Sequence, residues 1–246
     1  MKKKTKKRAI EKRNLNGNTI NRNIKRGFLY LYSLRYYVLF SFLLFLFTGL
    51  FGYFYPYLFQ EEIIKLIEQI VNQTKGLGLY ELIAFIITNN AKSAFFGFIL
   101  GLVFAIVPIS ILVVNGYIVG FVANKASNSA GILVLWRLLP HGIFEIPAIM
   151  ISVALGIKLG ISLLYDFYGF YNKGINKYLL CLLAIFSIIF VIVAFPMIFI
   201  ITLVNPVLRE KIFKNFKDSL FVFIFIVIPL LVIAGIIEGI LITAIG

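Results

Sequence analysis

The sequence predicts an all-α polytopic membrane protein, a bundle of about five transmembrane helices behind a basic N-terminal tail. Of its 246 residues, 61% are hydrophobic and 14% are charged, and the mean hydropathy is +0.98. A soluble domain contains about 45–50% apolar and about 25% charged residues, so this chain has too few polar side chains to cover a surface in water. Charged residues divide the chain into apolar blocks near the ~20 residues that a helix needs to cross a bilayer.

The first two apolar blocks differ in kind. Residues 36–60 carry no charge over 25 positions, longer than the ~7–15 residues of a cleavable signal core, so we predict a retained anchor helix. Residues 93–124 are 32 uncharged positions, about 48 Å as a straight helix, which is too long for one upright crossing and too short for two. We therefore expect a bent or re-entrant second block, with Pro108 and the Asn115-Gly116 pair as its helix breaks.

Three further crossings are predicted over residues 138–165, 178–208 and 219–246. Pro140 and Pro147 interrupt the first of these as candidate helix breaks. We divide the chain into a cytoplasmic tail, residues 1–35, and a transmembrane bundle, residues 36–246, in which segment 61–92 is an external amphipathic segment. Its helical spacing of apolar side chains predicts an interfacial helix, formed by Ile63, Ile67, Ile70 and Val71 opposite Glu61, Glu68 and Gln69. Asn89 and Asn90 are expected to cap the helix of the second block.

Basic residues predict the orientation, because they are enriched in cytoplasmic loops. Residues 1–35 hold 12 of the 24 Lys and Arg residues in a chain of net charge +14, which places the N-terminus in the cytoplasm. Lys125 and Arg137 would then mark a cytoplasmic turn, and the loop 166–177 and the C-terminus would lie outside the cell. The tail is expected to contact anionic lipid rather than nucleic acid, because no aromatic residue precedes Phe28 to stack on bases.

The densest polar feature surrounds Pro140, which suits the first position of a helix. From there His141 and Glu145 are four residues apart and share one helix face. An ionised carboxylate in hydrocarbon costs at least about 2.5 kcal/mol, so we expect Arg137, His141 or another helix to partner Glu145. The cluster is a polar clamp between helices, a proton or ion relay, or a hydrolytic site. Asn115 must also find partners at membrane depth.

No conventional catalytic or cofactor motif accompanies this cluster. Cys181 and His141 are the single cysteine and histidine, so we expect no metal site. The sequence lacks His-Glu-x-x-His, Gly-x-Ser-x-Gly and phosphate-loop patterns, and we expect neither enzymatic activity nor a cofactor. Four Gly-x-x-x-Gly spacings predict close helix packing, and one surplus face could serve a homodimer. They begin at Gly97, Gly116, Gly156 and Gly235.

A family resemblance rests on these same motifs. The stretch Leu-Pro-His-Gly-Ile-Phe-Glu-Ile-Pro-Ala at residues 139–148, together with Asn89-Asn90 and Asn115-Gly116, resembles the signature of the Stage II sporulation protein M family of integral membrane proteins. The family's namesake is regarded as the membrane anchor of a complex with peptidoglycan-degrading partners. The resemblance therefore implies a scaffold in the cell membrane that positions other membrane or envelope proteins.

Two alternatives to a scaffold follow from the residues themselves. A transporter or channel subunit could use Asn115, His141 and Glu145 to line a polar path through discontinuous helices. An intramembrane hydrolase is the more distant alternative, because no serine or metal motif stands beside His141.

Overall fold

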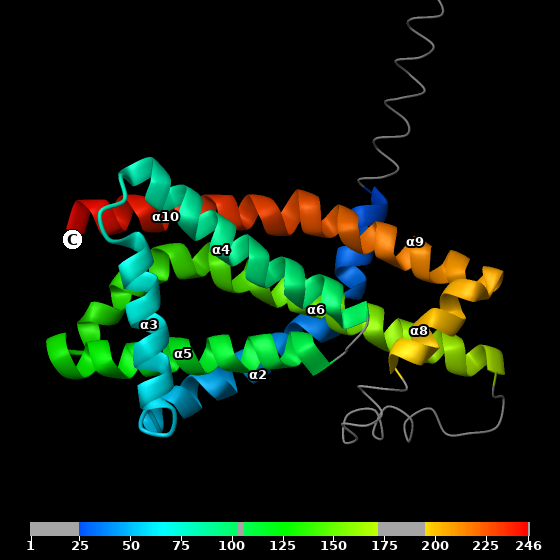
Figure 1. Ribbon diagram of the computed structural model, residues 1–246, viewed down its shortest axis with the longest axis horizontal. Helices are drawn as coiled ribbons and strands as arrows, with labels where there is room; N and C mark the ends of the chain where they lie inside the picture. Colours follow the sequence, from blue (N-terminus) through cyan, green and yellow to red (C-terminus); the bar gives the residue numbers. More distant parts are fainter. Residues whose placement is uncertain (1–24, 103–105, 172–194, 246) are drawn as a thin grey trace, which may run out of the picture.

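The apolar blocks of the chain form helices, most of which run along one axis (Figure 1). This computed structural model describes residues 25–102, 106–171 and 195–245, which are almost entirely helical and contain no strand. Residues 25–33 are helical. The elements that follow are α2 (Arg35–Phe54), α3 (Gln60–Thr74), α4 (Leu79–Ile99), the 3₁₀ turn η1 (Leu100–Leu102), α5 (Ile106–Ala130), the 3₁₀ segment η2 (Ile132–Leu138), α6 (Leu139–Tyr171), α8 (Phe195–Val204), α9 (Pro206–Val222), the π-helical turn η4 (Phe223–Val227) and α10 (Ile228–Ile245).

Five helices of the described part of the chain are long and apolar enough to cross a membrane, as predicted. They are α2, α4, α5, α6 and the continuous run of α9, η4 and α10. The all-α membrane bundle is therefore confirmed. The predicted crossing at 178–208 is not among the five, and its residues 178–194 lie outside the described residues.

The prediction of one bent span over residues 93–124 is wrong, because these residues belong to two crossings. The chain leaves α4 at Ile99 and enters α5 at Ile106. The prediction took Lys92 as the boundary of an apolar block, but Lys92 lies exposed within α4. The N-cap of α4 is Gly78, whose backbone N–H donates to Glu81 Oε2 at 3.0 Å. Residues 79–92 are thus part of a crossing and not of an external loop.

Most of the predicted helix breaks are also corrected. Pro108 lies in the first turn of α5, where the backbone N–H that proline lacks would have no partner within the helix. Gly116 lies inside the uninterrupted α5 and breaks nothing. Pro147 is inside the continuous helix α6, whereas Pro140 is the second residue of α6 and does stand at a helix start. Asn89 and Asn90 are mid-helix residues of α4, not caps.

The added crossing reverses the side on which residues 125–138 lie. Lys125 Nζ donates to Gln60 Oε1 at 2.9 Å, at the start of α3. Asn124 Nδ2 donates to the carbonyl of Tyr53, at the end of α2, also at 2.9 Å. The predicted grouping of Lys125 and Arg137 with the N-terminal tail is therefore wrong. We call this the α3 end of the bundle, where α3 lies across the other helices beside the C-terminus (Figure 1).

The opposite end, which we call the α9 end, gathers the N-terminus of α2, the C-terminal part of α6 and α9 (Figure 1). Asp166 of α6 lies here, because its Oδ1 accepts from Lys211 Nζ of α9 at 3.4 Å. The prediction that the loop from 166 lies on the side away from the tail is therefore wrong for its described part. Arg26, at the other side of this end, pairs with Asp218.

α3 is the predicted amphipathic helix. Ile63 is its buried residue, and it packs with Tyr117 and Phe121 of α5, with Ile67 beside them. The helix ends at Thr74, and Gly76 follows with a φ of 83°. Only glycine adopts this left-handed conformation readily, so Gly76 allows the chain to turn where the helix ends.

α2 and α5 touch through their backbones. A Cβ atom added at Gly120 would lie 1.9 Å from the carbonyl oxygen of Gly49, and one added at Gly52 would lie 2.2 Å from that of Tyr117. A Cβ at Gly116 would lie 2.1 Å from Thr48 Oγ1. Lipid tails are as apolar as leucine, so helices in a bilayer associate through such close approach. The predicted spacing of Gly116 and Gly120 is confirmed as a packing face.

The other predicted glycine spacings also contribute contacts inside the chain. A Cβ at Gly101 would lie 2.2 Å from the carbonyl oxygen of Gly156, and one at Gly156 would lie 2.2 Å from that of Gly97. Gly235 and Gly239 of α10 meet the side chains of Ile87 and Ile83 in α4. At least one glycine of each of the four spacings thus makes a close contact within the bundle.

α6 is the central helix. Two thirds of its crossing segment is buried, about twice the share of any other crossing. Leu155, Leu159 and Leu163 join one core cluster with residues of α4 and α10, and Ser152 donates to the carbonyl of Ala94 in α4. Polar side chains in the buried part of α6 therefore lie against other helices.

The glycine contacts lead to a test of stability. Gly120→Ala should lower the free energy of unfolding by about 1–3 kcal/mol, because the new methyl group meets backbone atoms that cannot turn aside. The readout is thermal denaturation in detergent followed by circular dichroism. Gly169→Ala is the matched control, since its Cβ has nothing within 4 Å and alanine favours a helix by about 0.5–1 kcal/mol. Equal melting shifts for both variants would contradict the packing argument.

Candidate functional site

Besides Asp166 at the end of its crossing segment, the central helix α6 carries two charged side chains within that segment, Glu145 and Lys158. They are 13 residues apart, about 20 Å along a helix axis. Glu145 lies toward the α3 end and Lys158 toward the α9 end. An intramembrane charge needs a partner, so each residue defines its own candidate site.

Glu145 is within electrostatic range of a second carboxylate. It is partly buried and interacts electrostatically with Glu238 of α10, the helix packed against α6. Nothing in the sequence connects Glu238 with Glu145, but the packing of α10 on α6 puts the charge of Glu238 within range of Glu145. Neighbouring carboxylates in hydrocarbon require a hydrogen-bond donor or a counter-charge.

The predicted donors Arg137 and His141 precede Glu145 along the chain. Arg137 is in η2, and His141 is in the first turn of α6, one helical turn before Glu145. Their side chains lie outside the described part of the chain, so the predicted contacts of Arg137 and His141 with Glu145 stay predictions. Among the side chains that the structure does describe, none donates a hydrogen bond to Glu145.

Asn115 and Asn90 are not brought to Glu145. Asn115 Nδ2 donates to the carbonyl of Ile111, one turn earlier in α5, at 2.7 Å, so the amide is partly satisfied by its own helix. Its neighbour Gly116 packs against α2. Asn90 is half-buried in the middle of α4. No hydrogen bond or ion pair between described side chains joins these residues into a continuous polar path.

Lys158 is the centre of a polar cluster that sequence reasoning missed. Its ammonium group donates to Ser33 Oγ and lies 3.6 Å from the ring centroid of Tyr30, a cation–π contact. The Tyr30 hydroxyl and Ser219 Oγ share a hydrogen bond of 2.6 Å. We call this the Lys158 cluster, formed by Arg26, Tyr30, Ser33, Lys158, Asp218 and Ser219.

Asp218 supplies the negative charge of the Lys158 cluster. Its two carboxylate oxygens accept from Arg26 Nη2 at 2.9 and 3.2 Å, and its charge also acts on Lys158. Burial raises the pKa of Tyr30 to about 12, so Tyr30 stays a neutral hydroxyl at physiological pH. The cluster thus fastens residues 25–33 to α6 and α9. The sequence does indicate that Lys158, an intramembrane cation, needs partners. It does not identify them, because they lie in segments far away in the sequence.

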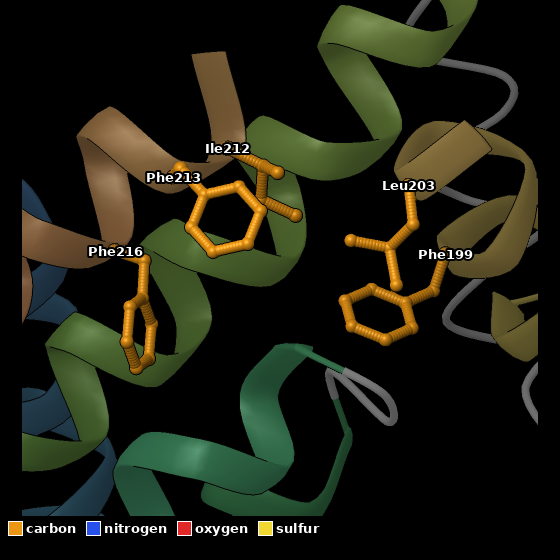
Figure 2. Close-up of a pocket in the computed structure, with 5 residues that line it drawn as sticks. All are labelled: Phe199, Leu203, Ile212, Phe213 and Phe216. Atoms are coloured by element: carbon orange, nitrogen blue, oxygen red, sulfur yellow. The ribbon is translucent and has the colours of Figure 1, made fainter. Parts of the chain in front are cut away.

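An apolar hollow of about 170 Å³ lies between α8 and α9 (Figure 2). It is lined by Phe199 and Leu203 of α8 and by Ile212, Phe213 and Phe216 of α9. No polar side chain lines it, and Glu145 and Lys158 are elsewhere on α6. The lining suits a hydrocarbon group and offers no chemistry for a reaction. Within the described residues no group of three His, Cys, Asp or Glu side chains could hold a metal ion.

The Lys158 cluster can be tested by proteolysis. Asp218→Asn should speed tryptic cleavage after Arg26 by about 1.4-fold to fivefold, because losing a partly exposed ion pair worth about 0.2–1 kcal/mol lets residues 25–33 open more often. Mass spectrometry would follow the new N-terminus at Gly27. Asp166→Asn is the matched control, since it removes the same charge at the same end from the longer pair with Lys211. Unchanged cleavage in Asp218→Asn would show that this pair does not hold the segment.

Comparison with known proteins identifies the family. The family model described as Stage II sporulation protein M matches residues 41–242, which covers all five crossing helices almost completely. Neither the curated proteins nor the solved structures gave a match. The match extends from α2 to α10 and includes the Pro-His-Gly motif that opens α6. The chain therefore belongs to the Stage II sporulation protein M family.

Proposed function

We propose that this protein is a non-enzymatic scaffold of the cell membrane that positions partner proteins there. The observation that carries the proposal is the backbone contact between crossings, at Gly49, Gly52 and Gly120 on one side of α6 and at Gly97 and Gly156 on another. Packed interfaces change between discrete arrangements and do not deform smoothly. A bundle held by backbone contacts suits an anchor, whereas alternating access requires one part of a transporter to rock against another.

The distribution of charge supports a cytoplasmic N-terminus. The described part of the chain begins with Lys25 and Arg26 at the α9 end, directly after the basic tail in the sequence, and that end also carries Arg209, Lys211, Lys214 and Lys217 of α9. The α3 end carries the acidic residues Glu61, Glu62 and Glu81. Positive loops remain in the cytoplasm, so the α9 end faces the cytoplasm and α3 lies at the outer interface. The corrected helix order strengthens this orientation, because Lys158 and the described start of loop 166–177 join the basic end.

Cysteine labelling tests the orientation. In a Cys181→Ser background, Gln69→Cys on α3 should react with a membrane-impermeant maleimide in intact cells, because Gln69 is exposed at the α3 end. Lys214→Cys, exposed on α9, should react only after the membrane is permeabilised. The reverse pattern would overturn the proposed orientation.

A transport role is the second candidate, favoured by the two carboxylates of Glu145 and Glu238 within the crossing segments. Intramembrane carboxylates occur in proton and ion pathways. The scaffold proposal assigns Glu145 instead to a clamp with Arg137 and His141 at the start of α6. Flux and stability measurements separate the two functions.

Glu145→Gln should lower the yield of folded protein by severalfold, because the amide removes the charge that Arg137 and His141 would pair with. Proteoliposomes with a pH-sensitive dye inside should stay equally impermeable with the wild-type and the variant protein. Glu238→Gln is the matched control, since it changes the facing carboxylate and leaves Glu145 intact. Wild-type proton flux that Glu145→Gln abolishes, with folding unaffected, would favour transport and overturn the scaffold proposal.

A further inference from the structure

One crossing helix presents polar side chains outward in the middle of the bilayer. α4 packs against α6 and α10 and buries Leu82, Ile86 and Phe98. On its other side it exposes Thr88, Asn89 and Lys92. Thr88 and Lys92 are one helical turn apart and Asn89 is beside Thr88, so the three form one patch, which we call the α4 polar face.

The α4 polar face lies at membrane depth. Asn89 is the central residue of the 21-residue helix Leu79–Ile99, so about 15 Å of helix separates it from either end. The next turn after Lys92 exposes Phe95 and Phe96, so the helix surface becomes apolar again before α4 ends. A lysine can extend toward the headgroups, but the short side chain of Asn89 cannot.

Partners for this face are missing from the described part of the bundle. Thr88, Asn89 and Lys92 make no hydrogen bond or ion pair with any residue that the structure describes. The other described threonines each donate to a carbonyl of their own helix; these are Thr48, Thr74, Thr202 and Thr243. Asn115 does the same. Polar groups that face acyl chains are costly, so the α4 polar face requires a protein partner.

A second copy of this chain is a poor partner for the face. The charge bias inserts every copy in one orientation, and a two-fold dimer of parallel copies would bring like residues together. Lys92 would then lie against Lys92 of the second copy. Glu81 offers no relief, because it lies eleven residues away and caps the N-terminus of α4. The glycine spacings that could have formed a dimer face are used within the chain.

Complementary chemistry instead requires an acidic partner. We propose that the α4 polar face binds a transmembrane helix of another membrane protein, in which a carboxylate pairs with Lys92 and an amide or hydroxyl one turn away pairs with Asn89 and Thr88. The proposal rests on the proposed scaffold function and names the chemistry of its partner. A carboxylate accepts from an ammonium group, and an amide both donates and accepts, so this arrangement satisfies all three residues.

Synthetic transmembrane helices provide the probe. Three leucine-rich peptides would differ only at one central position, which is Glu, Gln or Leu, and all three would carry an Asn one turn away. The full-length protein, labelled at Gln69→Cys in the Cys181→Ser background, would be reconstituted with each labelled peptide in liposomes. Energy transfer should show association at least tenfold stronger for the Glu peptide than for the Leu peptide, with the Gln peptide between them.

Variants of Lys92 assign the preference to the face. Lys92→Leu should abolish the preference for the Glu peptide, and Lys92→Glu should select a peptide with a central Lys instead. Lys125→Leu, which removes an exposed lysine at the α3 end, should leave the preference unchanged. Thermal melting of each variant would confirm that it is folded. Equal binding of all peptides, or a preference for Glu that survives Lys92→Leu, would overturn the proposal.

Two further outcomes would assign the face to a different occupant and overturn the proposal. Energy transfer between copies of the chain that Asn89→Leu abolishes would assign it to a homodimer. A disulfide within one chain between Asn89→Cys and the native Cys181 would assign it to this chain's own residues. If the peptides do not bind selectively, the proposed docking face is wrong, and the flux measurement is unaffected. If wild-type proton flux is found, the scaffold function is wrong, and the peptide measurement is unaffected.

Discussion

The structure depends on helices whose backbones touch. In a bilayer the lipid tails give apolar side chains no reason to leave the solvent, so helices hold together where small residues allow close approach. Here the carbonyl groups of Gly49 and Gly156 lie where a larger residue on the facing helix would put its side chain. α2 and α5 form one such pair, and α4 and α6 form another. These contacts place α6 in the centre, and the polar residues of α6 must therefore find their partners on other helices.

The helical class and the presence of several crossings could be predicted from the sequence because both depend on hydrocarbon thickness and composition, whereas the bounds of the crossings could not. The glycine spacings also predicted real contact faces, since close approach is a local property of a helix surface. The boundary at Lys92 failed for a physical reason: it assumed that a charge ends a crossing, whereas a charge that faces out of the bundle is compatible with one. Because each crossing reverses the chain, this one error moved Lys125 and Arg137 to the wrong side.

The candidate sites show the same difference between local and distant information. Pro140, His141 and Glu145 could be connected by counting residues, because neighbours one helical turn apart share a face. Glu238 could not be connected with Glu145, since the two meet only through the packing of α10 on α6. Lys158 likewise contacts Ser33 and Tyr30 because residues 25–33 pack against α6 in the folded bundle. A single sequence contains the ionisable residue that needs a partner but does not identify a partner in a distant segment.

The π-helical turn between α9 and α10 sets the directions in which two polar side chains of this long helix point. Ser219, bonded to Tyr30, and Glu238, close to Glu145, are 19 residues apart on one continuous helix. In an unbroken α-helix with ~3.6 residues per turn, 19 residues make about 5.3 turns, and the two side chains would face about 100° apart. The turn over Phe223–Val227, in which the N–H of Ile228 donates to the carbonyl of Phe223, takes up one extra residue. The remaining 18 residues make about five whole turns, so Ser219 and Glu238 point to the same side. The irregular turn thus lets one helix serve polar partners at both ends of the bundle while Phe223 and Val227 stay buried in the core between them.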